Sequence, residues 1–384
     1  MTKPVILTGI RANNDLHIGN YFGAMMPIVD MAKRHADQYE TNFFIPDLHS
    51  FTTPIDHSTL QASVMYNARA YIAAGLPIDH DSVHLYRQSF IPAHSELTVL
   101  LNNFTGFGEM ERMTQFKDKS GTYDQKEILR DIRDALITFK DGDTLLARVQ
   151  QMDLYNRIAK SMDSGNNASV GLFDYPVLMA SDILLYNTTY VPVGDDQTQH
   201  LEITRDIAAR MNNRFGKLFT VPAAVKQQHE FFGKDQGLRI KDLVDPSKKM
   251  SKSDETGKGV IFLSDDPEVA RKKIMSATTD DKASVNYDKA TQPGISNLID
   301  ILALLRASTP HDVEAQYKGM NRYGDFKKIV ADELVQFLID FQTRFDMVSS
   351  GEVVAKLASS EKAMNIVANE TLLRVQRAVG LRQP

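Results

Sequence analysis

The stretch Val5-Ile6-Leu7-Thr8-Gly9, followed after a polar turn by Leu16-His17-Ile18-Gly19-Asn20-Tyr21, decides the fold of this 384-residue chain. The apolar run predicts a buried strand, and apolar residues at helical spacing over 21–34 predict a helix directly after the turn. Such a turn places free backbone N–H groups and the positive end of a helix where an anion can sit. The sequence therefore predicts a strand, a turn and a helix arranged to bind a phosphate.

Strand-like and helical segments alternate after this turn. Expected strands at 42–45, 83–86 and 190–193 alternate with expected helices at 58–74, 94–104, 172–183 and 195–212. This alternation predicts an α/β fold with a Rossmann-like parallel sheet, helices on both faces and right-handed crossovers. Ligands bind beyond the carboxyl ends of such strands, so we expect residues 8–17, 47–49 and 194–197 to converge.

A second feature is the lysine-rich run Lys248-Lys249-Met250-Ser251-Lys252-Ser253, which follows the turn-forming Asp245-Pro246-Ser247. Ammonium groups are point charges that can follow moving phosphate oxygens, and no acid interrupts the run. By itself the run also fits an ordinary solvated loop. Its combination with the N-terminal turn favours a polyphosphate site.

The chain becomes mostly helical after the lysine-rich run. We expect a catalytic domain at 1–242, the lysine loop at 243–254, a helical domain at 255–349 and a last helix at 350–384 that packs back on the catalytic domain. Apolar residues at three- and four-residue steps predict an inserted helical hairpin at about 120–168. This insert either replaces a loop or modifies a dimer contact or the active site. The polar segment 226–240 is expected to be irregular or a hairpin.

Composition narrows the class of protein. The formal net charge of −5 lacks the excess of cations that non-specific coating of nucleic acid needs, although a local basic patch stays possible. No apolar run approaches the roughly 18 residues that span a bilayer, and the first residues lead into a strand, so we expect a cytoplasmic protein with no membrane segment. With no cysteine and no histidine-rich cluster, we expect no protein-bound metal site.

Two motifs carry a resemblance to a known family. His17-Ile18-Gly19-Asn20 and Lys249-Met250-Ser251-Lys252-Ser253 resemble the ATP-handling motifs of the class I aminoacyl-tRNA synthetases. Asn20 stands where histidine is commonest in that class, and Asn20-Tyr21-Phe22-Gly23-Ala24 resembles its tryptophanyl branch. The segments 108–117, 179–186, 191–197 and 293–298 point the same way. The chain thus resembles the bacterial-type tryptophanyl-tRNA synthetases over nearly its whole length, apart from the insert and residues 226–240.

The resemblance implies an activity and its partners. ATP would activate L-tryptophan as tryptophanyl-adenylate, and tRNA(Trp) would then accept the tryptophanyl group, with release of pyrophosphate and AMP. Mg²⁺ would accompany the ATP phosphates, coordinated mainly by their oxygens and by water. The resemblance also implies a homodimer, with the helical domain reading the anticodon. The basic residues available for RNA are scattered, at Lys327, Lys328, Lys356, Lys362, Arg374, Arg377 and Arg382.

The resemblance also implies which residues form the site. The residues that act on the phosphates would be His17, Asn20, Lys249 and Lys252, with Lys117 and Lys119. ATP would contact Arg11, His17, Gly19, Asn20, Gly194, Asp196, Lys249, Met250, Ser251, Lys252 and Ser253. Tryptophan would contact Leu7, His49, Gln115, Tyr175, Met179, Asp182, Val191, Val193 and Gln197. For Asp196, capping of the following helix is an alternative role, compatible with a contact to the ribose.

Asp182 carries the specificity hypothesis. It lies inside the apolar stretch Val177–Leu185, where an unpaired carboxylate is costly to bury, so something must pair with it. The resemblance implies that it accepts the indole N–H of the substrate, which would penalise phenylalanine because phenylalanine has no such donor. The alternative is a salt bridge to a neighbouring arginine.

The sequence leaves three other functions open. A tyrosyl-tRNA synthetase would share the fold and both ATP motifs, but it would need polar partners for a phenol hydroxyl. A catalytically silent relative that binds an amino acid or RNA would not need the intact lysine run. A generic nucleotidyltransferase with the same sheet would not need the segment around Asp182.

Overall fold

The computed structural model describes residues 3–9, 11, 16–52, 55–120, 169–192, 194, 197–232, 239–251 and 257–383, without the side chains of 118–120. The hairpin expected at about 120–168 therefore lies outside the described residues, except at its first residue. Val193, Asp196, Lys252, Ser253 and the side chain of Lys119 lie outside them as well.

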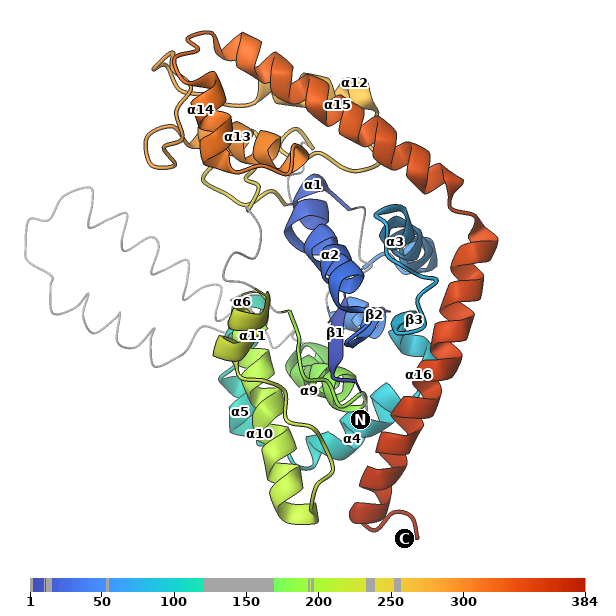
Figure 1. Cartoon of the computed structure of the whole chain (residues 1–384). Coiled ribbons are helices and arrows are strands. Elements are labelled where there is room, and N and C mark those ends of the chain that lie inside the picture. The colour runs from blue at the N-terminus through green and yellow to red at the C-terminus, as the bar shows by residue number, and fades with distance from the viewer. Residues whose placement is uncertain are drawn as a thin grey trace, which may run out of the picture.

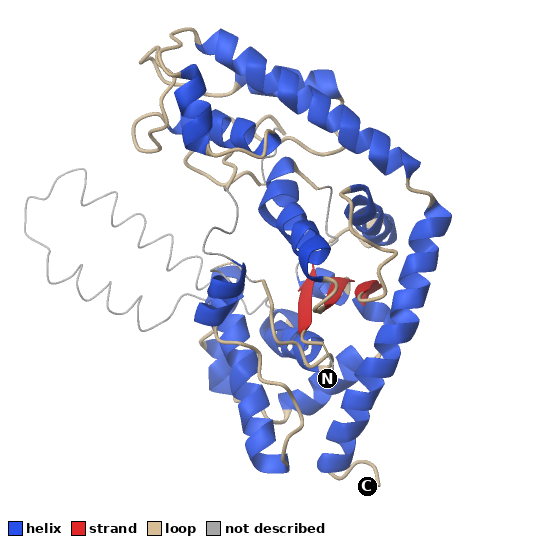
Figure 2. Ribbon diagram, viewed as in Figure 1, coloured by secondary structure: helices blue, strands red, loops and turns tan. Residues whose placement is uncertain are grey.

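A three-stranded parallel sheet lies at the centre of the molecule (Figures 1 and 2). Its strands are β1 (Val5–Gly9), β2 (Glu40–Ile45) and β3 (Val83–Arg87), in the order β1-β2-β3. The register pairs Leu7 with Asn42, and Phe44 with Tyr86. The predicted parallel α/β sheet is confirmed.

Helices connect and cover these strands. Between β1 and β3 they are α1 (Ile18–Asn20), the π-helical turn η1 (Tyr21–Met25), α2 (Met26–His35), the 3₁₀ turn η2 (Leu48–Thr52) and α3 (Leu60–Ala73). After β3 come the 3₁₀ turn η3 (Gln88–Phe90), α4 (Ala93–Asn102), α5 (Phe107–Glu111), α6 (Thr114–Ser120), α9 (Val170–Leu184), α10 (Thr198–Phe215) and α11 (Val225–Phe232).

The sheet is buried on both faces. Phe43 and Leu85 belong to an apolar cluster that includes residues of α2 and α3. Phe44 and Tyr86 belong to a second cluster, built with residues of α4, α9 and α10. Neighbouring side chains of one strand point to opposite faces, so consecutive apolar residues supply two cores.

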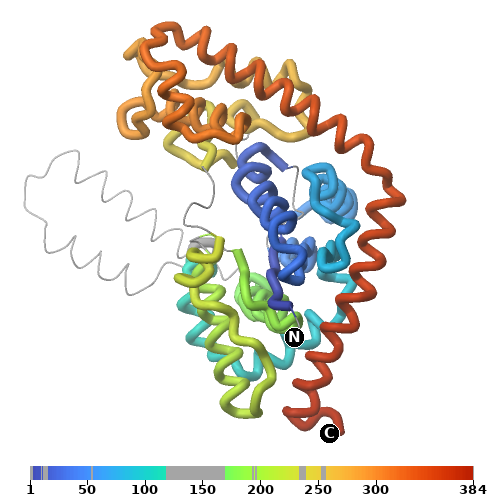
Figure 3. The backbone as a smooth tube through the Cα atoms, viewed as in Figure 1, coloured from blue at the N-terminus to red at the C-terminus, as the bar shows by residue number. Residues whose placement is uncertain are grey.

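The C-terminal part of the chain is helical. It comprises α12 (Pro267–Ser276), α13 (Pro293–Leu305), α14 (Pro310–Tyr317), α15 (Tyr323–Met347) and α16 (Ser350–Ala378). Figure 3 shows the chain leaving α15 and running back along the first part of the molecule as α16. This helix contacts α3, α4 and β3.

Helix α16 covers the outer edge of β3. Ser360 Oγ accepts a hydrogen bond from the Leu85 N–H at 3.0 Å, and Glu361 Oε1 accepts one from the Arg87 N–H at 3.3 Å. These side chains replace the partners that a fourth strand would supply. The backbone N–H groups on the free edge of β3 therefore have hydrogen-bond acceptors.

Two expectations about local structure need correction. Of the strand expected at 190–193, the described residues 190–192 form only one parallel bridge, between Ile6 and Tyr190, because Pro192 has no N–H to continue a ladder. Of the segment 226–240, expected to be irregular or a hairpin, residues 226–232 instead belong to α11. Phe231 of α11 stacks on Tyr190 with ring centroids 3.9 Å apart, so tertiary packing stabilises a helix where the polar sequence suggested a loop.

Candidate active site

A cavity of about 640 Å³ opens beyond the carboxyl ends of β1 and β2. Its lining residues are Leu7, Thr8, Gly9, Arg11, Phe44, Pro46, His49, Gln115, Tyr175, Met179, Asp182, Ile183, Val191, Pro192, Gly194 and Gln197. All the residues that the sequence assigned to tryptophan lie here, apart from Val193, which the structure does not describe. The cavity is mostly apolar, and Asp182 is the one carboxylate among its described lining residues.

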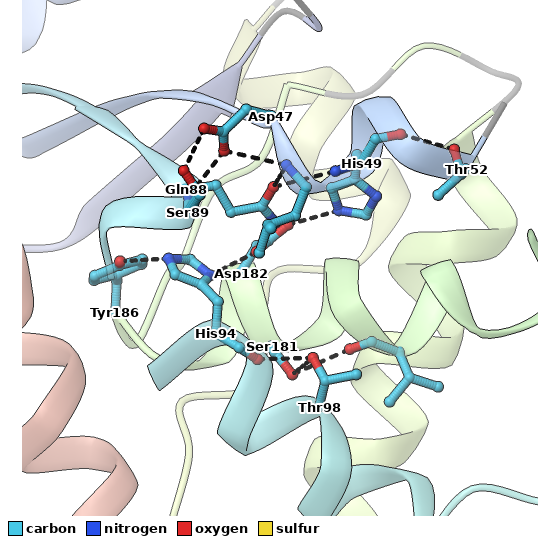
Figure 4. Close-up of polar contacts among 12 residues, drawn as sticks. Asp47, His49, Thr52, Gln88, Ser89, His94, Thr98, Ser181, Asp182 and Tyr186 are labelled. Atoms are coloured by element: carbon cyan, nitrogen blue, oxygen red, sulfur yellow. Dashed lines mark hydrogen bonds and ion pairs between the residues drawn. The ribbon is translucent and has the colours of Figure 1, made fainter. Parts of the chain in front are cut away.

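Asp182 is held by three side-chain donors (Figure 4). Gln88 Nε2 donates to Asp182 Oδ1 at 2.7 Å, and His94 Nδ1 lies 2.6 Å from the same oxygen. His49 Nε2 lies 2.8 Å from Oδ2. The expectation that a buried Asp182 must be paired is confirmed, and its partners among the described residues are two histidines and a glutamine rather than an arginine.

The hydrogen bonds keep Asp182 ionised although it is 1% exposed. Burial by itself would raise its pKa, but the hydrogen bonds from His49 and His94 and the attraction of both rings lower that pKa to about 2. An ionised carboxylate only accepts hydrogen bonds. The protons of the two rings therefore lie on His49 Nε2 and His94 Nδ1, which face the carboxylate.

The turns after β2 and β3 fix the donors in place. Gln88 Oε1 accepts hydrogen bonds from the N–H groups of Leu48 and His49, at 3.1 and 3.4 Å, which leaves its amide nitrogen facing Asp182. Asp47 accepts from the Ser89 N–H and Ser89 Oγ–H at 2.8 and 2.5 Å. The carboxyl ends of two neighbouring strands are thus tied together under the cavity.

A second polar group borders the other side of the cavity. The Tyr175 hydroxyl donates to Gln115 Oε1 at 3.1 Å and lies 2.6 Å from His200 Nε2. Because that hydroxyl has one proton, the His200 N–H is the donor in the second contact. The arrangement fixes the direction of the Gln115 amide.

A second cavity of about 800 Å³ adjoins the first and shares Pro192 and Gly194 with it. Its lining residues include Gly19, Asn20, Arg34, Phe231, Phe232, Arg239, Ile240 and Lys249. Among the described lining residues, Arg34, Arg239 and Lys249 are permanent cations and none is a carboxylate. This charge suits a phosphate-bearing ligand.

His17 and Asn20 cap the first turn of α1 reciprocally. The Asn20 N–H donates to His17 Nδ1 at 3.3 Å, and the His17 N–H donates to Asn20 Oδ1 at 3.2 Å. Since Nδ1 accepts, the proton of the neutral ring lies on Nε2, which makes that nitrogen a donor. A methyl group added at Gly19 would lie 2.9 Å from the His17 ring, so this position needs glycine.

The segment that follows the lysine loop is hydrogen-bonded directly to the first motif, and Met250 of the loop packs close to Gly19. The Ile18 N–H donates to the Ile261 carbonyl at 3.0 Å, and the Leu263 N–H donates to the Leu16 carbonyl at 2.8 Å. The Met250 N–H donates to the Ile240 carbonyl at 3.1 Å. The Met250 side chain is 1% exposed, and a methyl group at Gly19 would lie 3.8 Å from its Cβ.

The structure places the residues predicted to bind ATP in several different environments. It brings Gly19, Asn20, Gly194 and Lys249 to the second cavity, and Arg11 to the first. The buried Met250 side chain packs in the core, and the exposed Lys117 lies outside both sets of lining residues.

Sequence reasoning missed Gln88, His94 and Arg239. In the sequence, His94 stood out only as the first residue of the helix expected at 94–104.

Among the described residues, no helix has the length and apolar character to cross a membrane. In the same part of the chain, no group of three or more His, Asp or Glu side chains is placed to hold a metal ion.

Several known proteins are similar to this chain in sequence and in fold. The family model described as tRNA synthetases class I (W and Y) matches residues 2–140 and 144–339. The tryptophan–tRNA ligase of Leifsonia xyli is 39% identical, over 100% of this chain and 98% of the relative. A tryptophanyl-tRNA synthetase structure from Mycoplasma pneumoniae has a TM-score of 0.74 at 31% identity, covering 100% of this chain and 99% of that one. A Campylobacter jejuni structure complexed with ADP and tryptophan has a TM-score of 0.71 at 27% identity, covering 98% and 100%.

Proposed function

The chain belongs to the tRNA synthetases class I (W and Y), and from this premise we propose the reaction and the roles of its residues. The reaction is activation of L-tryptophan by ATP to tryptophanyl-adenylate, followed by transfer to tRNA(Trp). Pyrophosphate leaves in the first step and AMP in the second. The 39% identity to a tryptophan–tRNA ligase over the full chain supports this assignment.

Tryptophan occupies the first cavity in this proposal. The observation that carries it is an ionised Asp182 in a largely apolar wall. Oδ1 already accepts two hydrogen bonds, whereas Oδ2 accepts one from the described residues, so Oδ2 has capacity for the indole N–H. Apolar residues such as Leu7, Met179 and Val191 surround the rings.

ATP occupies the second cavity, with its α-phosphate at the boundary between the two cavities. His17 Nε2–H and the Asn20 side-chain amide donate to phosphate oxygens, and Lys249 follows the pyrophosphate as it leaves. The tryptophan carboxylate attacks the α-phosphorus, so no protein nucleophile is needed. Holding the two reactants in line contributes roughly 7 to 11 kcal/mol in intramolecular models, and aligned donors stabilise the charge that develops.

The remaining assignments complete the phosphate site. Lys252, Ser253 and Asp196 act from segments outside the described residues, Lys252 and Ser253 on the phosphates and Asp196 on the ribose. Lys117 and Lys119 also act on the phosphates in this proposal, although the exposed Lys117 is not among the lining residues of either cavity. Mg²⁺ would arrive with ATP, held mainly by phosphate oxygens and water, and it would offset the charge of the phosphates.

The helical part at 255–349 contacts tRNA(Trp), and two chains form a homodimer. Several bases expected to contact RNA have structural bonds instead. Lys327 Nζ donates to the Ala277 carbonyl at 2.7 Å, Lys356 Nζ to the Ile78 carbonyl at 2.6 Å, and Arg374 Nε to the Leu218 carbonyl at 2.9 Å. These bonds leave less donor capacity on the three side chains, so in this proposal the other basic residues of the set carry more of the RNA contact, and binding should weaken with salt.

Amino-acid-dependent ATP–pyrophosphate exchange tests the proposal. Tryptophan, tyrosine and phenylalanine are assayed separately, with Lys249→Ala as the low-activity reference and with MgCl₂ either present or chelated. We expect exchange with tryptophan, phenylalanine disfavoured roughly 10⁴-fold, and loss of exchange without Mg²⁺. Exchange with tyrosine would move the chain to the tyrosine branch, and no exchange with any of the three amino acids would contradict the proposal.

A further inference from the structure

His94 lies directly behind Asp182 and does not line either cavity. Its side chain is fully buried on α4, with Nδ1 2.6 Å from Asp182 Oδ1 and Nε2 2.8 Å from the Tyr186 hydroxyl. Figure 4 shows the ring between these two partners. A residue in this position acts on a substrate only through Asp182.

The chemistry of the contacts gives the arrangement a direction. The proton on His94 Nδ1 points at the carboxylate, and Nε2 forms a hydrogen bond with the Tyr186 hydroxyl, which can donate or accept in that contact. Burial raises the pKa of Tyr186 well above its usual value, which keeps that hydroxyl protonated. Tyr186 therefore holds the His94 ring in the orientation that donates to Asp182, and hydrogen bonds in such a chain polarise one another.

The two carboxylate oxygens are not equivalent. Oδ1 accepts from Gln88 and His94, which occupies both of its favoured acceptor directions, whereas the described residues supply Oδ2 with one donor, from His49. Two donors on Oδ1 fix the rotation of the carboxyl group. That rotation decides where the remaining acceptor direction of Oδ2 points.

We propose that His94 is a positioning residue for substrate selection, which turns Asp182 so that Oδ2 meets the indole N–H and which is itself oriented by Tyr186. This inference rests on the proposed function, because it assumes that the ligand of the first cavity donates an N–H to Asp182. It assigns specificity to a side chain that never touches the substrate.

Two substrates that differ only in the N–H donor distinguish this positioning role from a general loss of folding or activity. Tryptophan carries the indole N–H, and 3-benzothienylalanine has sulfur in its place and no donor. The measured quantity is the ratio of kcat/KM for the two amino acids in pyrophosphate exchange. A change in folding or in ATP binding alters both values together and leaves the ratio unchanged.

His94→Ala should lower the tryptophan-to-analogue ratio about 10-fold or more, mainly through the KM for tryptophan. His94→Asn, which can keep a donor near the Nδ1 position, should restore the ratio to within about threefold of wild type. Tyr186→Phe, which leaves the ring in place without its second partner, should give an intermediate ratio. The control is His84→Ala on β3, which removes a histidine that lies 3.2 Å from Glu40 Oε2 and is not among the lining residues of either cavity.

Equal losses for both substrates in His94→Ala would overturn the inference, because a purely structural role predicts them. An unchanged ratio in both His94→Ala and Tyr186→Phe would also overturn it. If His94→Ala does not fold, Tyr186→Phe and His94→Asn still provide the ratio. Failure of the proposed function looks different, since the wild-type chain would then support no tryptophan-dependent exchange.

Discussion

Glu361 on α16 accepts two hydrogen bonds from the guanidinium of Arg87 at the end of β3, at 2.6 and 2.9 Å. The Arg87 side chain is 13% exposed and the Glu361 side chain is 9% exposed. The residue after Arg87 is Gln88, which donates to Asp182. The C-terminal helix is therefore joined to the strand that carries part of the amino-acid site.

Removal of this pair should destabilise the fold. Glu361→Ala leaves a mostly buried guanidinium without its carboxylate, and we expect the free energy of unfolding to fall by about 3 kcal/mol. The measurement is urea denaturation of both proteins. Glu230→Ala is the matched control, because Glu230 faces Lys226 in an exposed pair at 3.9 Å, and its loss should cost about 0.5 kcal/mol or less. Equal effects of the two substitutions would contradict the structural role of Glu361.

Asp182 should make stability depend on acid pH. Its pKa is lowered from the ordinary 3.8 to about 2, so its ionised form stabilises the fold above about pH 4, and this contribution disappears as the pH falls through 2. The difference in unfolding free energy between wild type and Asp182→Asn should therefore shrink by about 2 kcal/mol from pH 5 to pH 2.

Asp174 on the same helix provides a control of opposite sign. Burial raises the pKa of Asp174 despite a hydrogen bond from Asn102, so its protonated form is favoured in the folded state. The difference between wild type and Asp174→Asn should grow in favour of wild type as the pH falls through the raised pKa. Differences that do not change with pH for either variant would contradict the assigned environments.

A substitution in the His17–Asn20 capping pair should lower catalysis without lowering stability. Asn20→Asp keeps the oxygen that accepts the His17 N–H but replaces the amide donor by a negative charge beside the phosphate site. We expect thermal stability within about 0.5 kcal/mol of wild type and kcat for pyrophosphate exchange lower by roughly 100-fold. Exchange retained at the wild-type rate would exclude a role of Asn20 in phosphate binding.

Gly259 should be intolerant of a side chain. A methyl group there would overlap the Asp242 carboxylate, which accepts the N–H groups of Val244 and Asp245 at 2.8 and 2.9 Å at the base of the lysine loop. Gly259→Ala should cost about 1–3 kcal/mol of stability and raise the KM for ATP. Gly324→Ala is the control, since a methyl group there has nothing within 4 Å and favours helix α15. A normal KM in Gly259→Ala would show that the loop does not depend on Asp242.

The sequence predicted the parts of the site that local pattern controls. The strand before residue 10 and the helical segment that begins near His17 were predicted from apolar spacing, whereas the His17–Asn20 capping pair is a finding of the structure. The need to pair Asp182 followed from its apolar neighbours.

The partners of Asp182 could not be predicted, because they lie 133, 94 and 88 residues away, at His49, Gln88 and His94. Only the parallel sheet brings these positions together. Met250 shows the same limit, since its place in a motif suggested a ligand contact and its neighbours in space make it a core residue.

Aminoacylation tests the central claim most directly. Purified protein is incubated with ATP, Mg²⁺ and tRNA(Trp), with each of tryptophan, tyrosine and phenylalanine in turn, and the 3′-esterified tRNA is quantified. The account predicts tryptophanyl-tRNA(Trp) from tryptophan and no product above background from the other two amino acids. Charging with tyrosine, or no charging with tryptophan, would contradict it.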